Sequence, residues 1–383
     1  MKTILTISHT DYTHSLGGIE KVLLEQSEVF MDCGYHVVHI CPNTTSFAVM
    51  NHTLLSKHNG YDLLVNNKKK AERANIAEVY ACLREFEVCK IIIHSLIGMS
   101  ESDVNRLLSH YKYADVLYYI HDYKTVCTGQ VLLRNKIKYC GADGRKFMKC
   151  MACRFFWEGI SVYRYYSRFT EAYPNVTYLF PSEIARKIWS TSYSRVSSER
   201  LKVIPHQKLL GATVRPHHEN DRLRIAYVGY KSFNKGWKTF RALYNYDKKC
   251  QYDYYVLGKT NEILPNVKQV SVSFIDDGPD AMIKALRNNK IDVALLWSPW
   301  PETYSYTFYE SYVGGAFILT NPNSGNIQAQ ICVHGCGKIL VDEDALFKYF
   351  FSEELKKDVI GDKMERPTRL EMNVEGLKDV LGI

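Results

Sequence analysis

A chain of 383 residues is too long for one ordinary hydrophobic core and suits two α/β domains of similar size. Hydrophobic residues make up 46% of the sequence and charged residues 23%, and this balance excludes a disordered or fibrous protein. The formal net charge is +8, and residues 124–168 alone hold ten Lys or Arg against only Asp143 and Glu158. A basic field of this kind favours anionic partners such as phosphate groups or an acidic membrane face.

The first residues and the cysteines bear on where the protein works. Residues 1–10 are not followed by the apolar core and cleavage site of a secretory signal, and no apolar stretch approaches the roughly 20 residues that span a bilayer. The eleven Cys are therefore expected to be reduced thiols or metal ligands rather than a disulfide framework. We expect a cytoplasmic protein, and peripheral attachment at the inner face of the cell membrane stays open.

In the first half of the chain, strands alternate with helices. The apolar run 4–7 precedes a loop that ends in Gly17-Gly18, and an amphipathic helix follows up to Gly34, a C-cap residue. Further strands are expected at 36–41, 61–65, 90–94, 116–121 and 176–180. This alternation predicts a parallel, doubly wound sheet.

A second α/β series follows the polar stretch 211–221, which is typical of a linker. Its strands are expected at 223–228, 254–257, 270–274, 291–297, 317–320 and 338–341. Helices are expected at 237–244, 281–288, 308–313 and 345–355. Two such domains place their ligand-binding loops at strand carboxyl ends, which we expect to face each other across a cleft.

Three loops carry candidate ligand groups. Gly17 and Gly18 open a helix, where backbone N–H groups can approach an anion, although a glycine pair is also a plain turn. In the second half, Lys231 and Lys235 precede a helix and can neutralise a diphosphate, although surface lysines flank many helices. Glu302 and Glu310 are separated by seven residues across a strand-to-helix junction. A loop carboxylate there can accept hydrogen bonds from sugar hydroxyls, while the helix N-terminus presents N–H groups to phosphate.

These stretches resemble the retaining glycosyltransferases of the GT-B fold, above all glycosyltransferase family 4 of the bacterial surface-polysaccharide (O-antigen or capsule) type. The similar stretches extend over nearly the whole chain: GGIEKV at 17–22, HDY at 121–123, VIPH at 203–206, KG at 235–236, ETYSYTFYE at 302–310 and GAFILTNPNSGNI at 315–327. The resemblance implies two Rossmann-like domains and retention of anomeric configuration, without a metal in catalysis.

The resemblance also implies roles for particular residues. Glu302 contacts the transferred sugar, Glu310 the nucleotide ribose, and His121 lies by the reacting sugar. The arginine that the family has after the loop glycine is Tyr230 here, so Lys235 is the phosphate ligand and Lys231 a candidate substitute. The family usually has an aromatic residue or Gly, then Gly and an apolar residue, where Tyr304, Ser305 and Tyr306 stand; the phosphate contacts there are mainly from the backbone. The substrate-binding residues are then Gly17, Gly18, Lys231, Lys235, Tyr306, Thr307 and Glu310.

Four cysteines form a second candidate site. Cys150 and Cys153 have the C-x2-C spacing of a zinc knuckle, and Cys127 and Cys140 can complete a closed tetrahedral site with a structural role. Ordinary cysteines are the alternative. The next stretch, 155–169, mixes aromatic and basic residues without a nucleic-acid motif, so it is expected to be a membrane-facing or acceptor-facing helix or an ordinary core helix.

Together these features predict a hexosyl- or deoxyhexosyltransferase that uses a nucleotide-sugar donor and a glycan or lipid-diphosphate-linked acceptor. Residues 1–210, with a Cys-rich insertion at 124–154, would bind the acceptor, residues 222–360 the donor, and 364–383 would form a helix that crosses back. The alternatives are a noncatalytic GT-B subunit that binds a partner transferase, or a sugar phosphorylase or nucleotide-sugar epimerase of the same fold.

Overall fold

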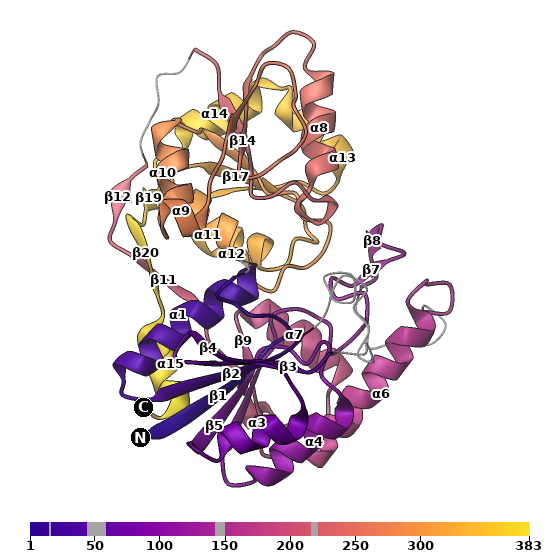
Figure 1. Ribbon diagram of the computed structural model, residues 1–383. Helices are drawn as coiled ribbons and strands as arrows, with labels where there is room; N and C mark the ends of the chain where they lie inside the picture. Colours follow the sequence, from indigo (N-terminus) through magenta and orange to yellow (C-terminus); the bar gives the residue numbers. More distant parts are fainter. Residues whose placement is uncertain (15–16, 44–58, 142–149, 216–220) are drawn as a thin grey trace. The chain divides into compact units, whose positions relative to one another are not determined.

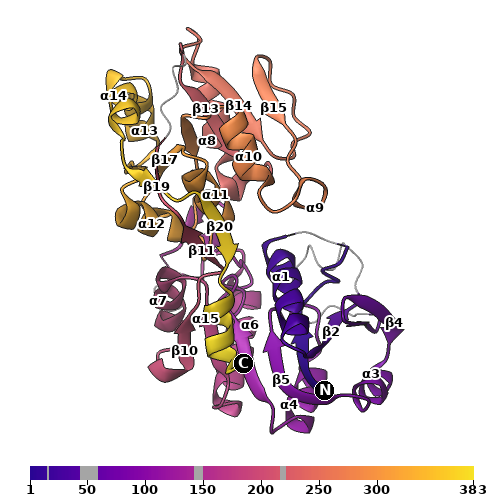
Figure 2. The ribbon, with the colours of Figure 1, turned by 90° about the vertical axis from the view of Figure 1, so that its left-hand side faces the viewer.

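The computed structural model describes residues 1–14, 17–43, 59–141, 150–215 and 221–383 (Figure 1). The chain forms two compact units. Unit 1 comprises Met1–Gln130, Ala142–His206 and Asn373–Ile383, and unit 2 comprises Val131–Gly141 and Gln207–Met372. Both ends of the chain therefore lie in unit 1 (Figure 2).

Unit 1 contains an eight-stranded sheet in the order β10-β9-β6-β5-β1-β2-β3-β4. The strands are β1 (Lys2–Ile7), β2 (His36–Pro42), β3 (Tyr61–Val65), β4 (Lys68–Ala74), β5 (Glu87–Ile93), β6 (Asp115–Tyr119), β9 (Thr177–Phe180) and β10 (Leu201–Val203). Its helices are α1 (Gly18–Asp32), α3 (Ile76–Leu83), α4 (Glu101–His110), α6 (Phe156–Ala172), α7 (Glu183–Ser192) and α15 (Val374–Leu381), and η1 (Ser198–Arg200) is a 3₁₀ turn. The central strands β1, β5 and β6 are parallel and almost fully buried at their carboxyl halves.

The parallel, doubly wound sheet that the sequence predicts has an antiparallel edge. β3 pairs antiparallel with β2, and β4 pairs antiparallel with β3. Asn66 and Asn67 form the turn between β3 and β4, and both have positive φ. A two-residue hairpin turn of type I′ requires positive φ at both of its central residues. The sequence of β4, KKKAERA, is largely exposed and charged, as an edge strand can be.

Unit 2 contains a fully parallel six-stranded sheet in the order β15-β14-β13-β16-β17-β18. The strands are β13 (Arg224–Val228), β14 (Asp253–Leu257), β15 (Val267–Val270), β16 (Val293–Leu295), β17 (Phe317–Thr320) and β18 (Gly337–Ile339). Its helices are α8 (Trp237–Tyr246), α9 (Phe274–Asp277), α10 (Ala281–Asn288), α11 (Tyr306–Val313), α12 (Asn326–His334), α13 (Glu343–Phe350) and α14 (Glu353–Gly361), with the 3₁₀ turn η2 (Phe233–Lys235) before α8.

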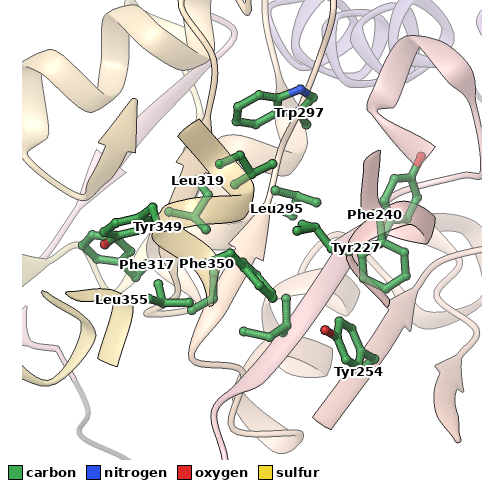
Figure 3. Packing of buried hydrophobic residues seen from close by; sticks show 14 of the residues in the cluster. Tyr227, Phe240, Tyr254, Leu295, Trp297, Phe317, Leu319, Tyr349, Phe350 and Leu355 are labelled. Atoms are coloured by element: carbon green, nitrogen blue, oxygen red, sulfur yellow. The ribbon is translucent and has the colours of Figure 1, made fainter. Parts of the chain in front are cut away.

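The six-stranded sheet is buried on both faces, because alternate residues of each strand enter two separate cores. Tyr227, Leu295, Phe317 and Leu319 pack on one face against α8, α13 and α14 (Figure 3). The intervening residues, such as Ala226, Ala294 and Ile318, pack on the other face against α10, α11 and α12. Burial on both faces explains why these strands are continuous apolar runs in the sequence.

Three short pairings complete unit 2. β11 (Gln207–Leu210) pairs antiparallel with β20 (Arg369–Met372), and β12 (Thr213–Val214) pairs with β19 (Glu365–Arg366). A hairpin joins β7 (Leu133–Arg134) and β8 (Lys138–Tyr139). The stretch 211–221, expected to be a linker, thus includes β12 and the buried Arg215, and its residues 216–220 lie outside the described part of the chain.

Several expected elements have different bounds. Residues 364–383 are not one helix: β19 and β20 precede α15, because Pro367 cannot continue a helix and Asn373 caps α15 through its side chain. The expected helix 345–355 is divided into α13 and α14, the second capped by Ser352. The expected strand 270–274 ends at Val270, and Ser273 instead caps α9. Within the described ranges, no helix is long and apolar enough to cross a membrane.

Candidate functional site

The best-defined site lies at the carboxyl edge of the six-stranded sheet in unit 2, where the loops after β13 and β16 touch. Gly236 ends the first loop with φ of +81°, and a Cβ built there would lie 2.4 Å from the Trp297 carbonyl oxygen. The Ser298 hydroxyl donates a hydrogen bond of 3.0 Å to the Asn234 carbonyl. Only glycine permits both this backbone conformation and this approach, so Gly236 fixes the position of its neighbour Lys235.

Lys235 and Glu302 form an ion pair at the centre of this site. The Lys235 Nζ lies 2.7 Å from Glu302 Oε2, and the Glu302 side chain is only 1% exposed. Burial by itself lowers the pKa of Lys235, but the attraction and hydrogen bond of Glu302 prevail and raise it, so the ammonium stays charged. The other oxygen, Glu302 Oε1, is buried and has no hydrogen-bond partner among the described residues.

The backbone around Glu302 is held in place by the loop after β17. The Glu302 N–H donates to the Ser324 carbonyl over 3.3 Å, and the Asn326 N–H donates to the Glu302 carbonyl over 2.9 Å. Between these partners Gly325 has φ of +65° and lies so close that a Cβ would be 2.5 Å from the Pro301 carbonyl carbon. The carboxylate is therefore fixed by three loops of one sheet edge before any ligand arrives.

Glu310 lies on α11, and its charge also contributes to the raised pKa of Lys235. The helix begins just after Ser305, whose side chain does not cap it and instead contacts the Thr307 hydroxyl at 3.1 Å. Tyr306 and Thr307 occupy the first two helical positions and are half-buried. The Ser305 side chain therefore leaves the first turn of α11, the helix that carries Glu310, without a side-chain cap.

Lys231, the candidate substitute phosphate ligand, forms an ion pair with Glu262 in this structure. Its Nζ lies 2.6 Å from Glu262 Oε2, and Arg241 and the Trp237 indole N–H bind the same carboxylate. The hydrogen bond from Lys231 is the main cause that lowers the pKa of Glu262. Lys231 is therefore engaged by Glu262, and only Lys235 joins Glu302.

In unit 1, His121 follows β6 and contacts His94, which follows β5. The His94 Nδ1 lies 2.9 Å from His121 Nε2, and the two ring planes differ by 12°. Tyr119 and His206 pack against His121 at ring-centroid distances of 5.2 and 5.5 Å. Burial is the main cause that lowers the pKa of His94 and His121 well below the usual range, so both rings are neutral.

Sequence reasoning selected His121 but missed His94 and His206. The expected strand 90–94 ends at His94, and His206 ends the VIPH stretch, so each carries the signal of a polar residue at a strand end. From the sequence, only His121 was chosen as a candidate site residue on this signal.

The loop at Gly17 and Gly18 opens α1 as expected, but a carboxylate already occupies the helix start. The Glu20 side chain accepts a hydrogen bond of 2.9 Å from the Gly17 N–H and another of 2.8 Å from the Thr10 hydroxyl. His9 approaches the same carboxylate at 3.5 Å. A phosphate at this end would meet negative charge, and residues 15 and 16 lie outside the described part of the chain.

The four candidate zinc ligands all lie within the described ranges. No three His, Cys, Asp or Glu side chains in the described ranges come together as a metal site. Cys140 is exposed, while Cys127, Cys150 and Cys153 are half-buried, and residues 142–149 between them are outside the described ranges. The structure therefore gives no support to zinc at these residues, and metal analysis of the purified protein decides the prediction.

Helix α6 covers the stretch that mixes aromatic and basic residues. Phe156, Val162, Tyr165, Tyr166 and Phe169 are buried, as in a core helix. Trp157 is 78% exposed, and Arg154, Arg164 and Arg168 are exposed as well. The helix thus has a core face and a separate exposed face with Trp157, Arg164 and Arg168, and Arg154 lies just before the helix.

Comparisons with known proteins identify the fold. No protein-family model matches the sequence, and no curated protein matches it either. Among solved structures, the chain is similar to sucrose-phosphate synthase from Thermosynechococcus elongatus, with a TM-score of 0.60 and 14% identity over 95% of this chain and 92% of the other. It is similar to Anabaena HepE in complex with UDP-glucose, with a TM-score of 0.52 and 11% identity over 95% and 93%. It also matches a trehalose-6-phosphate synthase, studied for glycosyl transfer with retention, with a TM-score of 0.50 and 10% identity over 100% and 95%.

These similarities and the two doubly wound sheets establish the class of architecture: the chain has the GT-B fold of glycosyltransferases.

Proposed function

We propose that the protein is a retaining glycosyltransferase that takes its sugar from a nucleotide-sugar donor bound at unit 2. The observation that carries this proposal is the Lys235–Glu302 pair, in which one carboxylate oxygen binds the lysine and the other is buried with no hydrogen-bond partner in the part of the chain that the structure describes. A buried, unpaired acceptor is costly unless a ligand donor satisfies it, and sugar hydroxyls are such donors. The similar HepE structure is a complex with UDP-glucose, which supports a nucleotide sugar as the donor class.

Each group at this edge has a distinct task in the proposed reaction. Glu302 Oε1 accepts a hydrogen bond from a hydroxyl of the transferred sugar, and Glu310 binds the ribose of the nucleotide. Lys235 and the first-turn N–H groups of α11, at Tyr306 and Thr307, neutralise the diphosphate as it leaves. These charges are already in position before the leaving group develops its charge, which is how electrostatic catalysis works. The bond from the anomeric carbon to the diphosphate breaks, the acceptor hydroxyl oxygen bonds to that carbon on the same face, and the hydroxyl proton passes to the departing diphosphate, so the configuration is retained.

Residues of unit 1 complete the proposal. His121 is proposed to contact the reacting sugar, and Gly17 and Gly18 to belong to the substrate-binding residues, as the resemblance implies. The acceptor is proposed to be a glycan or a lipid-diphosphate-linked glycan used to build a surface polysaccharide, and the transferred group a hexosyl or deoxyhexosyl unit.

Peripheral binding to an anionic membrane at the inner face of the cell is proposed as well. The exposed Trp157, Arg154, Arg164 and Arg168 support it, because each basic residue near an anionic bilayer contributes about 1 kcal/mol. Lys124 does not, because it is only 3% exposed, and Arg145, Lys146 and Lys149 lie outside the described residues. Sedimentation with anionic vesicles should be lost in about 0.5 M salt, where screening is nearly complete. Equal recovery with neutral and anionic vesicles at low salt would contradict membrane binding.

The experiment that tests the donor site is a thermal-shift panel of nucleotides and nucleotide sugars. A ligand that binds only the folded state raises the melting temperature by mass action. Glu310→Ala should weaken nucleotide binding by ~1.5–3 kcal/mol, the usual range for hydrogen bonds to a charged group. Glu354→Ala, an exposed glutamate on α14, is the matched control and should leave binding unchanged. Unchanged nucleotide affinity in a folded Glu310→Ala protein would refute the ribose contact.

A further inference from the structure

The contact between His94 and His121 bears on which ring nitrogen of His121 carries the proton. The Nδ1 of His94 and the Nε2 of His121 are 2.9 Å apart, and the ring planes differ by 12°. Ring N–H bonds and ring lone pairs lie in the plane of an imidazole, so this geometry fits one hydrogen bond with one proton between the two nitrogens.

His94 is the more constrained of the two rings. It is 2% exposed, its backbone N–H donates to the Ile7 carbonyl over 2.8 Å, and its ring packs parallel to Tyr119 at 5.0 Å. Its other nitrogen, Nε2, is buried without a hydrogen-bond partner among the described residues. His94 therefore cannot turn to another partner without losing this packing.

Two arrangements of the protons are open to a pair of neutral imidazoles. If His121 donated from Nε2, then His94 would carry its own proton on Nε2, as a buried N–H without an acceptor. If His94 instead donates from Nδ1, its Nε2 carries no proton and is a buried acceptor without a donor among the described residues. Orphaned buried N–H groups are rarer in proteins than under-satisfied acceptors, which favours the second arrangement.

We infer that His94 is a positioning residue that holds His121 in the tautomer protonated at Nδ1. His121 then presents an N–H, not a lone pair, at the nitrogen that points away from His94. The role of that N–H toward the sugar rests on the proposed function, because it makes His121 a hydrogen-bond donor to an oxygen of the substrate. The tautomer itself is a property of unit 1 and needs no substrate.

Nitrogen-15 NMR of the labelled imidazoles tests the tautomer in the protein without nucleotide. The His121 signals, assigned by their loss in His121→Asn, should show the proton on Nδ1. His94→Phe keeps an aromatic ring but removes the donor, so His121 should lose this preference. His94→Asn places an amide nitrogen near the position of Nδ1 and should restore it. A proton on Nε2 of His121 in the parent protein would overturn the inference, as would the parent tautomer in a folded His94→Phe protein.

Turnover separates this inference from the proposed function. With saturating donor and acceptor, His94→Phe should reduce kcat by about two- to tenfold, the change that loss of a neutral hydrogen bond of ~0.5–1.5 kcal/mol produces. The KM for the donor should change little, and His94→Asn should recover most of the rate. If the tautomer changed but kcat did not, the inference would stand and the catalytic role of His121 would be refuted. If kcat fell while the tautomer stayed as in the parent, His94 would act through packing alone and the inference would fail.

Discussion

Glu302 is a buried carboxylate that forms an ion pair with Lys235. Its side chain is 1% exposed and its Oε2 is paired with Lys235, whose side chain is 21% exposed. Removing one partner of a buried pair leaves the other charge uncompensated, which is far more destabilising than losing an exposed pair. The same residues that we assign to the donor site should therefore also affect folding stability.

Lys235→Ala should lower the free energy of unfolding by about 2–3 kcal/mol. This loss is somewhat smaller than the loss for a fully buried pair, because the Lys235 side chain retains some exposure. The double variant Lys235→Ala/Glu302→Gln should recover at least ~1 kcal/mol, since the buried charge is then removed. Denaturant unfolding measures both values. Lys231→Ala is the control, because its more exposed pair with Glu262 should contribute far less to stability. A double variant no more stable than Lys235→Ala would contradict this account of the pair.

At the scale of elements, the turn between β13 and α8 positions Lys235 through one glycine. Gly236→Ala must keep φ near +81° and bring its Cβ against the Trp297 carbonyl, so the loop must move. We expect a loss of more than ~1–2 kcal/mol in stability, from the left-handed conformation alone, and a weaker affinity for the donor. Gly361→Ala, at the end of α14, has nothing within 4 Å of the new Cβ and no positive φ. It should be neutral in both measurements; equal effects of the two variants would contradict the positioning role of Gly236.

The sequence predicts best those elements whose burial leaves a local apolar pattern. β17 was placed correctly at Phe317–Thr320 and α10 at Ala281–Asn288, because burial on both sheet faces or one helix face leaves a clear apolar pattern. β3 was also placed correctly, but its direction was not, because strand pairing is a long-range property. β4 was missed, because an exposed, charged edge strand has no apolar alternation.

The candidate site shows the same division. The spacing of Glu302 and Glu310 and the Lys235-Gly236 pair are local in sequence and were found there. The contact of Lys235 with Glu302 links positions 67 residues apart, and the capture of Lys231 by Glu262 links positions of two different loops. No local pattern encodes such pairs. The hydrogen bond of His94 to His121 joins the ends of two neighbouring strands and was likewise invisible to local reasoning.

At the scale of the whole molecule, each unit has its own core, and the chain returns to unit 1 after completing unit 2. The returning segment, Asn373–Ile383, buries Leu377 and Leu381, each 1% exposed, in unit 1. In unit 2, Arg215 is buried and donates to the carbonyls of Gly315 and Asp292. Substitution of Leu377 should therefore destabilise unit 1, and substitution of Arg215 should destabilise unit 2.

Calorimetry should resolve two unfolding transitions, one for each unit. Leu377→Ala should cost ~2–5 kcal/mol, as for a fully buried leucine, and lower the transition of unit 1. Arg215→Ala should lower the transition of unit 2, because it removes the hydrogen bonds that the guanidinium donates to buried carbonyls. A nucleotide that binds at Lys235 and Glu310 should raise the transition that Arg215→Ala lowers. Stabilisation by the nucleotide of the transition that Leu377→Ala lowers would contradict the assignment of the donor site to unit 2.

The central claim is that this chain transfers a sugar with retention from a nucleotide-sugar donor. The most direct measurement is proton NMR of the reaction of the purified chain with a nucleotide sugar from the thermal-shift panel and a glycan acceptor. We predict release of the nucleotide and a product whose anomeric configuration matches that of the donor, with no product from a folded Glu302→Gln protein. A product of inverted configuration, or conversion of the donor sugar in the absence of any acceptor, would contradict the claim.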